Sequence, residues 1–264
     1  MRSLIYTLAA LAWLVSGNVA ASYITMATGF SVTEGPDGMV LDVTTTNQGD
    51  ESAYGIQFVV QIGKQKFTTA SVPQLGVNQA TSSNLSIQDA FSLPGRYPVL
   101  IKTHYQDANG HPFTALSVGF HDYQHSVVSK VLIQAEDASI PSNGKGTMKF
   151  TLRNNDSVER DLVLTLYLPD ELATLKESDS LTIGPRQTRS LQYTIENFSA
   201  LENSGYAIAL LAEYDDGNSH YATAGSGTLR IAEPDTMAGY LPWVVAAIAA
   251  VILVFPIIIR LRRK

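Results

Sequence analysis

The chain has 264 residues, 45% of them hydrophobic, and its 24 acidic residues outnumber 18 lysines and arginines, which gives a formal net charge of −6. It contains no cysteine, which excludes disulfides, thiolate metal sites and a cysteine nucleophile. The acidic balance argues against a nucleic-acid partner, because neutralising phosphates requires a basic surface.

The N-terminus has the pattern of a secretory signal peptide over residues 1–21. Arg2 provides a short positive start, residues 4–15 form an apolar run, and the small residues before position 22 suit a signal peptidase. We therefore expect cleavage after Ala21, and the alternative is an uncleaved N-terminal anchor. An exported chain without disulfides is more typical of bacteria or archaea than of an animal cell surface.

The C-terminus predicts a single transmembrane helix over residues 239–259. This segment has no charged residue, and as a helix its 21 positions reach about 31 Å, enough to cross a hydrocarbon core of about 30 Å. Tyr240 and Trp243 lie at its upstream edge, and the basic tail 260–264 follows it, which favours a cytoplasmic C-terminus. The pattern predicts a single-pass type I protein of the cell membrane, whose ectodomain lies in the periplasm or at the cell surface.

The segment from Ser22 to Met237 is strongly acidic. It holds all 24 acidic residues but only 13 of the 18 cations, because Arg2 and four residues of the tail lie outside it, so its net charge is near −11. Such a charge keeps an exposed domain soluble and disfavours lying flat on an anionic membrane.

Short runs rich in β-branched and aromatic residues recur along this segment, separated by glycine, asparagine, aspartate and proline, as is typical of strands and turns. In the run 97–105, alternation predicts a buried face with Val99, Ile101 and Thr103 and a solvated face with Leu100, Lys102 and His104. The nearest approach to a helix is 169–177, where we expect at most one turn. The predicted strands are 39–45, 55–62, 66–71, 81–87, 97–105 and 113–120, then 130–135, 146–152, 161–168, 189–195, 206–214 and 220–231.

The two halves carry similar motifs in the same order, about 108 residues apart, which indicates a duplicated module of about 105 residues. Seven or so short strands per module predict an all-β fold: two tandem immunoglobulin-like antiparallel β-sandwiches, 22–126 and 127–234, followed by the membrane helix. The matched positions are Asn47 and Asn154, Gly76 and Gly184, Gln79 and Gln187, Gly95 and Gly205, Tyr105 and Tyr214, and Phe113 and Tyr221.

The segments "NQGDESAYGIQFVVQIG", "LGVNQ" and "PGRYPVLIKTHYQDANGH" resemble the immunoglobulin-like CARDB modules of bacterial and archaeal surface proteins. The resemblance covers 39–120, and more weakly 130–231, where the proline before Gly205 is missing and Gly-Asp is replaced by Asn-Asp. It implies a fold and an extracytoplasmic location, and no catalytic residue. The end of the chain, "AEPDTMAGYLPW" and later "RLRRK", resembles a PEP-CTERM sorting tail without its first proline, although we expect an ordinary anchor.

Two groups of side chains are candidate metal ligands. His121 and His125, four positions apart, could bind zinc with Asp122, although exposed strand residues near an interdomain hinge show the same pattern. The acidic turns 107–110 and 215–218 could hold calcium weakly, but neither has enough oxygen ligands, and simple hairpin turns explain both. We therefore predict no metal site and no cofactor.

The sequence favours no catalytic site. It has no Gly-x-Ser-x-Gly motif, the pair Asp170 and Glu171 carries no weight in so acidic a chain, and no predicted helix follows Gly225-Ser226-Gly227 to make a phosphate loop. Three glycosylation sequons matter only in a host that glycosylates asparagine; they begin at Asn84, Asn155 and Asn197.

We thus predict a non-enzymatic, membrane-anchored protein that binds or scaffolds another envelope protein or a surface glycan. One alternative is an accessory subunit of a membrane enzyme or export complex, since the small residues around Ala246 and Ala250 permit close helix packing. Another is a carbohydrate-binding module with an exposed aromatic strip of Tyr97, Tyr105 and Phe113, although core positions are the default for these residues.

Overall fold

The computed structural model describes residues 23–35, 38–88, 90–233 and 243. In the described part of 23–233 the regular elements are all strands, which confirms the all-β class. The helical turn expected at 169–177 is wrong, because Leu172–Thr174 forms strand β13.

The predicted signal peptide and membrane helix lie outside the described residues, apart from Trp243. Among the residues that the structure does describe, none belongs to a helix with the length and hydropathy needed to cross a membrane.

The first module, residues 23–123, places two sheets face to face in the manner of a β-sandwich. One is the antiparallel sheet β1-β2-β6, and the other has the order β8-β7-β3 with β4 and β5 both paired to β3. The strands are β1 (Met26–Gly35), β2 (Gly38–Asn47), β3 (Ala53–Ile62), β4 (Gln65–Thr68), β5 (Val72–Leu75), β6 (Ala80–Ile87), β7 (Gly95–Gln106) and β8 (Pro112–Tyr123).

The second module, residues 131–232, repeats this design. Its sheet β13-β15-β11-β9 faces a sheet of order β14-β12-β16-β17, to which β10 adds in parallel. The strands are β9 (Val131–Ala135), β10 (Ala138–Pro141), β11 (Lys145–Asn154), β12 (Arg160–Tyr167), β13 (Leu172–Thr174), β14 (Ser178–Ile183), β15 (Thr188–Asn197), β16 (Gly205–Asp215) and β17 (His220–Ala232).

Each module has its own hydrophobic core between its sheets. In the first, Leu41 and Val43 of β2 meet Phe58 of β3 and Ile101 of β7, all at most 1% exposed. Alternate positions of these strands point inward, as a period of two requires. The second core includes Phe150, Leu164 and Ile208. Each module therefore buries apolar area independently.

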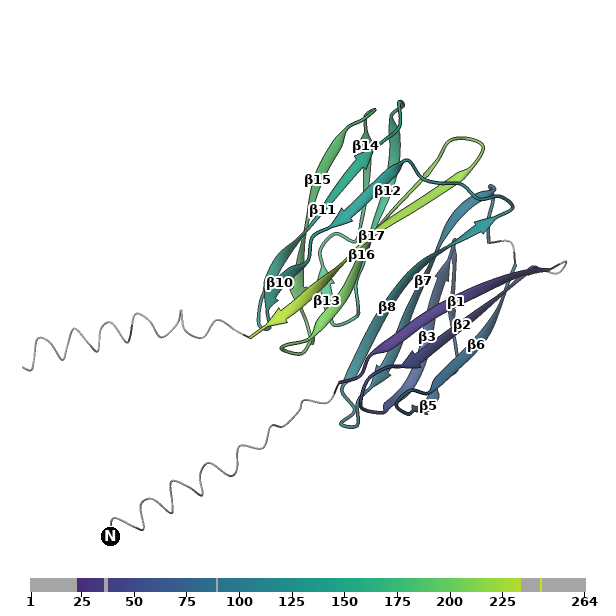
Figure 1. Cartoon of the computed structure of the whole chain (residues 1–264). Coiled ribbons are helices and arrows are strands. Elements are labelled where there is room, and N and C mark those ends of the chain that lie inside the picture. The colour runs from purple at the N-terminus through teal and green to yellow at the C-terminus, as the bar shows by residue number, and fades with distance from the viewer. Residues whose placement is uncertain (1–22, 36–37, 89, 234–242, 244–264) are drawn as a thin grey trace, which may run out of the picture.

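The modules lie side by side and share a sheet (Figure 1). β17 pairs with β7 in parallel at a single position, His220 opposite Gly95, and the His220 amide donates to the Pro94 carbonyl at 2.9 Å. This bridge joins the sheet of the first module that contains β7 to the sheet of the second module that contains β17, which gives one sheet of ten strands.

The face of β7 predicted to be solvated is instead turned toward the second module. Leu100 is 4% exposed, and together with Lys102 and His104 it lines a cavity that Tyr167 and Asp170 close from the other side. The prediction of a solvated face is wrong for Leu100, which lies between the modules, whereas the side chains of Lys102 and His104 remain about one-third exposed, at 29% and 34%.

Gly95 is required where the modules meet. Its φ is +140°, and a Cβ there would lie 2.1 Å from the His220 carbonyl oxygen. We expect Gly95→Ala to lower the free energy of unfolding by about 1–3 kcal/mol, because it combines backbone strain with a clash against main chain. Urea unfolding followed by circular dichroism measures this change.

The matched control is Gly29→Ala on β1, where a Cβ would meet nothing within 4 Å. Equal effects of the two substitutions would contradict this role of Gly95.

Candidate functional site

Two asparagines end equivalent strands of the two modules, as predicted, and their side chains form equivalent hydrogen bonds. The fully buried Asn47 side chain donates to the carbonyls of Glu51 and Leu75, at 2.7 and 3.2 Å. Asn154, 107 positions later, donates to the carbonyls of Val158 and Ile183, at 2.8 and 3.2 Å. Both asparagine side chains therefore supply hydrogen-bond donors to buried backbone carbonyls, which is a structural role.

The glycine–glutamine turns are equivalent too. The Gly76 amide donates to the Gln79 side chain at 2.9 Å, and the Gly184 amide donates to Gln187 at 3.0 Å. The predicted duplication thus extends to individual hydrogen bonds of the two modules.

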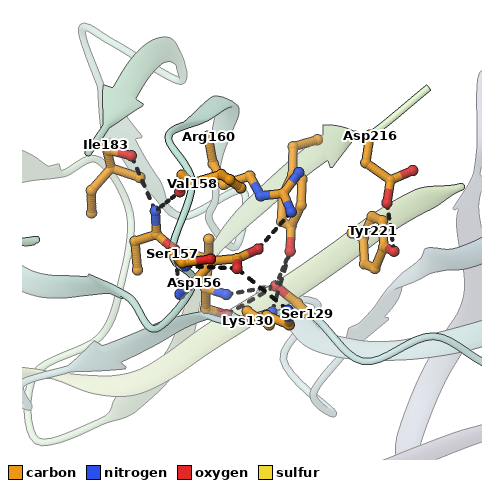
Figure 2. Close-up of polar contacts among 12 residues, drawn as sticks. Ser129, Lys130, Asp156, Ser157, Val158, Arg160, Ile183, Asp216 and Tyr221 are labelled. Atoms are coloured by element: carbon orange, nitrogen blue, oxygen red, sulfur yellow. Dashed lines mark hydrogen bonds and ion pairs between the residues drawn. The ribbon is translucent and has the colours of Figure 1, made fainter. Parts of the chain in front are cut away.

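A second polar cluster surrounds Asp156 in the second module (Figure 2). Its side chain is 6% exposed and accepts from Arg160 at 2.6 Å, from the Ser157 amide at 2.7 Å and from Lys130 at 3.3 Å. The Arg160 hydrogen bond is the largest cause that lowers the pKa of Asp156, to about 2. The carboxylate is therefore fully paired.

This cluster also ties down the segment that connects the modules. The Ser129 hydroxyl lies 3.2 Å from the Tyr214 hydroxyl, which accepts from the Lys130 amide at 3.2 Å. The Arg160 guanidinium lies 5.3 Å from the centre of the Tyr214 ring. These contacts fix the start of the second module and hold no group poised for chemistry.

The residues of the zinc hypothesis do not converge. His121 Nε2 lies 3.1 Å from Glu34, and His125 Nε2 lies 3.2 Å from the Ser219 hydroxyl. Asp122 accepts from Arg96 at 2.8 Å. No group of three metal-ligating side chains occurs within the part of the chain described.

The acidic turns are hairpin turns in which a carboxylate caps backbone amides. Asp107 accepts from the amides of Asn109 and His111, at 2.9 and 2.8 Å. Asp216 accepts from those of Asn218 and Ser219, at 3.1 and 2.9 Å. Their oxygens are already used within the turns.

The exposed aromatic strip is not formed. Tyr97 and Tyr105 are buried, at 6% and 9% exposure. The Tyr97 ring stacks on His220 with ring centres 4.2 Å apart, and Phe113 stacks on Tyr105 at 5.5 Å.

His220 is held tightly at the junction. Its Nδ1 lies 2.7 Å from Asp215 and its Nε2 lies 3.1 Å from Glu213. Burial lowers the His220 pKa, but the hydrogen bonds to both carboxylates outweigh it and leave the pKa above its ordinary value. The ring therefore favours the charged form.

The interface also contains two neighbouring hollows, which together we call the interdomain cleft. Cavities of about 330 and 720 Å³ share Tyr105, Phe113 and Thr114 of the first module. The second module closes the smaller one with Asp170, Glu171, Phe198 and Ser199, and the larger one with residues 201–207.

Glu171 is the least expected residue of the cleft. It is 3% exposed, and its carboxylate forms no ion pair in the described chain. Burial raises the pKa of its carboxyl, and hydrogen bonding from the Thr114 amide and hydroxyl opposes this rise only in part. From the sequence, the pair Asp170 and Glu171 carried no weight as a site, because the burial of Glu171 depends on segments far from it along the chain.

No protein-family model and no curated protein matches the chain. Among solved structures, native Escherichia coli alpha-2-macroglobulin is similar over 79% of this chain and 17% of that chain, with 10% identity and a TM-score of 0.31. The elastase-activated form of that protein matches over 82% and 23%, with 11% identity and a TM-score of 0.29. Red sea bream transglutaminase matches over 80% and 32%, with 12% identity and a TM-score of 0.25. This chain thus spans less than a third of each of these proteins, and similarities this low define no family or activity.

We expect the stabilising contribution of Asp156 to be complete above about pH 4 and to be lost as the pH falls through its folded-state pKa of about 2, because a lowered pKa favours the ionised folded form. Asp156→Asn should therefore lower the Tm at pH 7, and its Tm should approach that of the wild type toward pH 2. Thermal unfolding between pH 7 and 2 measures this convergence.

The control is the exposed neighbouring acid, Glu159→Gln. A Tm difference for Asp156→Asn that stays constant across this range would show that the ion pairs do not carry the effect.

The pH dependence of stability expected for His220 is opposite to that for Asp156. A raised pKa stabilises the fold fully below the unfolded-state value of about 6.5, and this contribution is lost as the pH rises through the folded-state pKa. His220→Gln should therefore lower the Tm most at pH 5 to 6 and least at alkaline pH, as measured by scanning calorimetry. A Tm deficit of His220→Gln that stays the same from acidic to alkaline pH would refute the assignment.

Proposed function

We propose that the chain is a non-enzymatic, membrane-anchored extracytoplasmic protein that binds or scaffolds a partner through two tandem immunoglobulin-like modules. The observation that carries this proposal is the joining of two repeated modules into one sheet through the His220–Gly95 bridge. A shared sheet fixes the distance and angle between two surfaces, which is what a scaffold requires.

The anchoring part of the proposal rests on the sequence. The apolar segment 239–259 is long enough to span a bilayer, and the basic tail 260–264 favours the cytoplasmic side. Residues 1–21 would direct export of the modules. The strong negative charge of the segment between them suits an exposed, soluble ectodomain.

The binding part rests on how the polar groups are used. The clusters around Asn47, Asn154 and Asp156 satisfy backbone or pair charges, as structural groups do. The interdomain cleft differs, because it combines open volume, aromatic walls and an unpaired acid. Binding sites typically have concave, largely apolar walls with a few polar groups.

Fusions to alkaline phosphatase, which becomes active only where its disulfides form outside the cytoplasm, test the topology in a bacterial host. Phosphatase fused after residue 233, replacing 234–264, should be active, and phosphatase fused after residue 264 should be inactive. Deleting residues 1–21 from the first fusion should abolish its activity. Activity of the fusion after residue 264 would refute the proposed orientation.

A further inference from the structure

Glu171 sits where an acid is costly. Glu171 is 3% exposed, and its carboxylate forms no ion pair in the described chain. Hydrogen bonding from Thr114 offsets only part of the effect of burial on this acid. A buried charge without a partner of opposite charge loses its hydration at a large cost. The neighbouring Asp170, by contrast, forms an ion pair with Lys102. Glu171 is thus a buried acid of the cleft whose charge no cation of the described chain balances.

The walls around Glu171 come from both modules. Tyr105 and Phe113 of the first module and Phe198 of the second line the same cavity of about 330 Å³. Phe198 is 82% exposed, so one wall remains accessible from solvent. The space beside Glu171 suits a narrow, flexible group that enters along the aromatic surface.

Apart from His104 and the tyrosines, the ionisable side chains that line the cleft are acidic. Asp170 and Glu171 line the smaller cavity, and Glu51, Asp107 and Glu202 line the larger one. No lysine or arginine lines either cavity within the described chain. Burial lowers the pKa of His104, the histidine at the edge, which disfavours its charged form. The electrostatics therefore select a cation.

We propose that the interdomain cleft binds a primary ammonium group at the end of an alkyl chain, with Glu171 as its acceptor. An ammonium has three donors for carboxylate oxygens, and the rings of Tyr105, Phe113 and Phe198 favour a cation and its methylene groups. A metal ion fits less well, because no three metal-ligating side chains gather anywhere in the described residues. The ammonium could belong to a small soluble amine or to a lysine of a partner protein.

This inference rests on the binding role proposed above but not on the membrane topology. If the amine does not bind, the phosphatase-fusion result is unaffected, so failure of this inference can be told apart from failure of the proposed topology.

The test uses the full chain in nonionic detergent micelles and isothermal titration calorimetry at pH 7. The amine ligands are 1,5-diaminopentane and the blocked tripeptide acetyl-Ala-Lys-Ala-amide; their neutral counterparts are 1,5-pentanediol and the norleucine tripeptide. We expect an amine to bind and its neutral counterpart not to bind. Glu171→Gln should weaken amine binding roughly tenfold or more, because it removes a charge-assisted hydrogen bond. Tighter binding of the tripeptide would point to a partner's lysine, and tighter binding of the diamine to a soluble amine.

The matched control is Glu177→Gln, which removes an exposed carboxylate that does not line the cleft and should leave the affinity unchanged. A Tm of Glu171→Gln equal to or above that of the wild type shows that loss of binding is not loss of folding. The proposal is overturned if neither amine binds at about 10 mM, if the neutral ligands bind equally, or if Glu171→Gln binds amines as the wild type does.

Discussion

The contact between the backbones of Gly95 and His220 is the constraint on which the arrangement of the two modules depends. One hydrogen bond, from the His220 amide to the Pro94 carbonyl, lets two independent sandwiches share a sheet. Only a residue without Cβ allows the main chains to approach so closely. The His220 ring then stacks on Tyr97 and is held by two carboxylates, so the junction combines backbone pairing, aromatic contact and charge.

The duplicated turns show why much of the fold could be predicted. Asn47 and Asn154 sit at strand ends because a short amide side chain can satisfy turn backbone that strand pairing leaves unpaired. Such information is local, and it recurs at a fixed spacing, so the sequence alone identifies it. The central strands were predicted for the same reason: their alternation of buried and exposed residues lies within ten consecutive positions.

The missed features depend on distant contacts. The sequence indicated no strand for β1 or β14, which have sparse apolar residues and lie at sheet edges, where pairing partners rather than composition decide the conformation. The second face of β7 looked solvated because nothing local shows that another module covers it. Likewise His121 and His125 share a spacing suited to a metal, but Glu34 and Ser219, from distant segments, contact them separately.

Two buried acids of the second module show how structure can separate an architectural group from an available one. Asp156 and Glu171 are both nearly inaccessible, at 5% and 3% exposure, and nothing in the sequence shows that either is buried. Asp156 is surrounded by Arg160, Lys130 and a backbone amide, so its ionised form is favoured and the surrounding turn depends on it. Glu171 has no cationic partner, and burial raises its pKa despite hydrogen bonding from Thr114. An architectural role does not require an acid at position 171, since glutamine or a hydrophobic residue would fill the same space without the cost of desolvating a carboxyl group. The position of Glu171 beside an open, aromatic cavity between the two modules is the reason for proposing that a cation from outside the chain balances its charge.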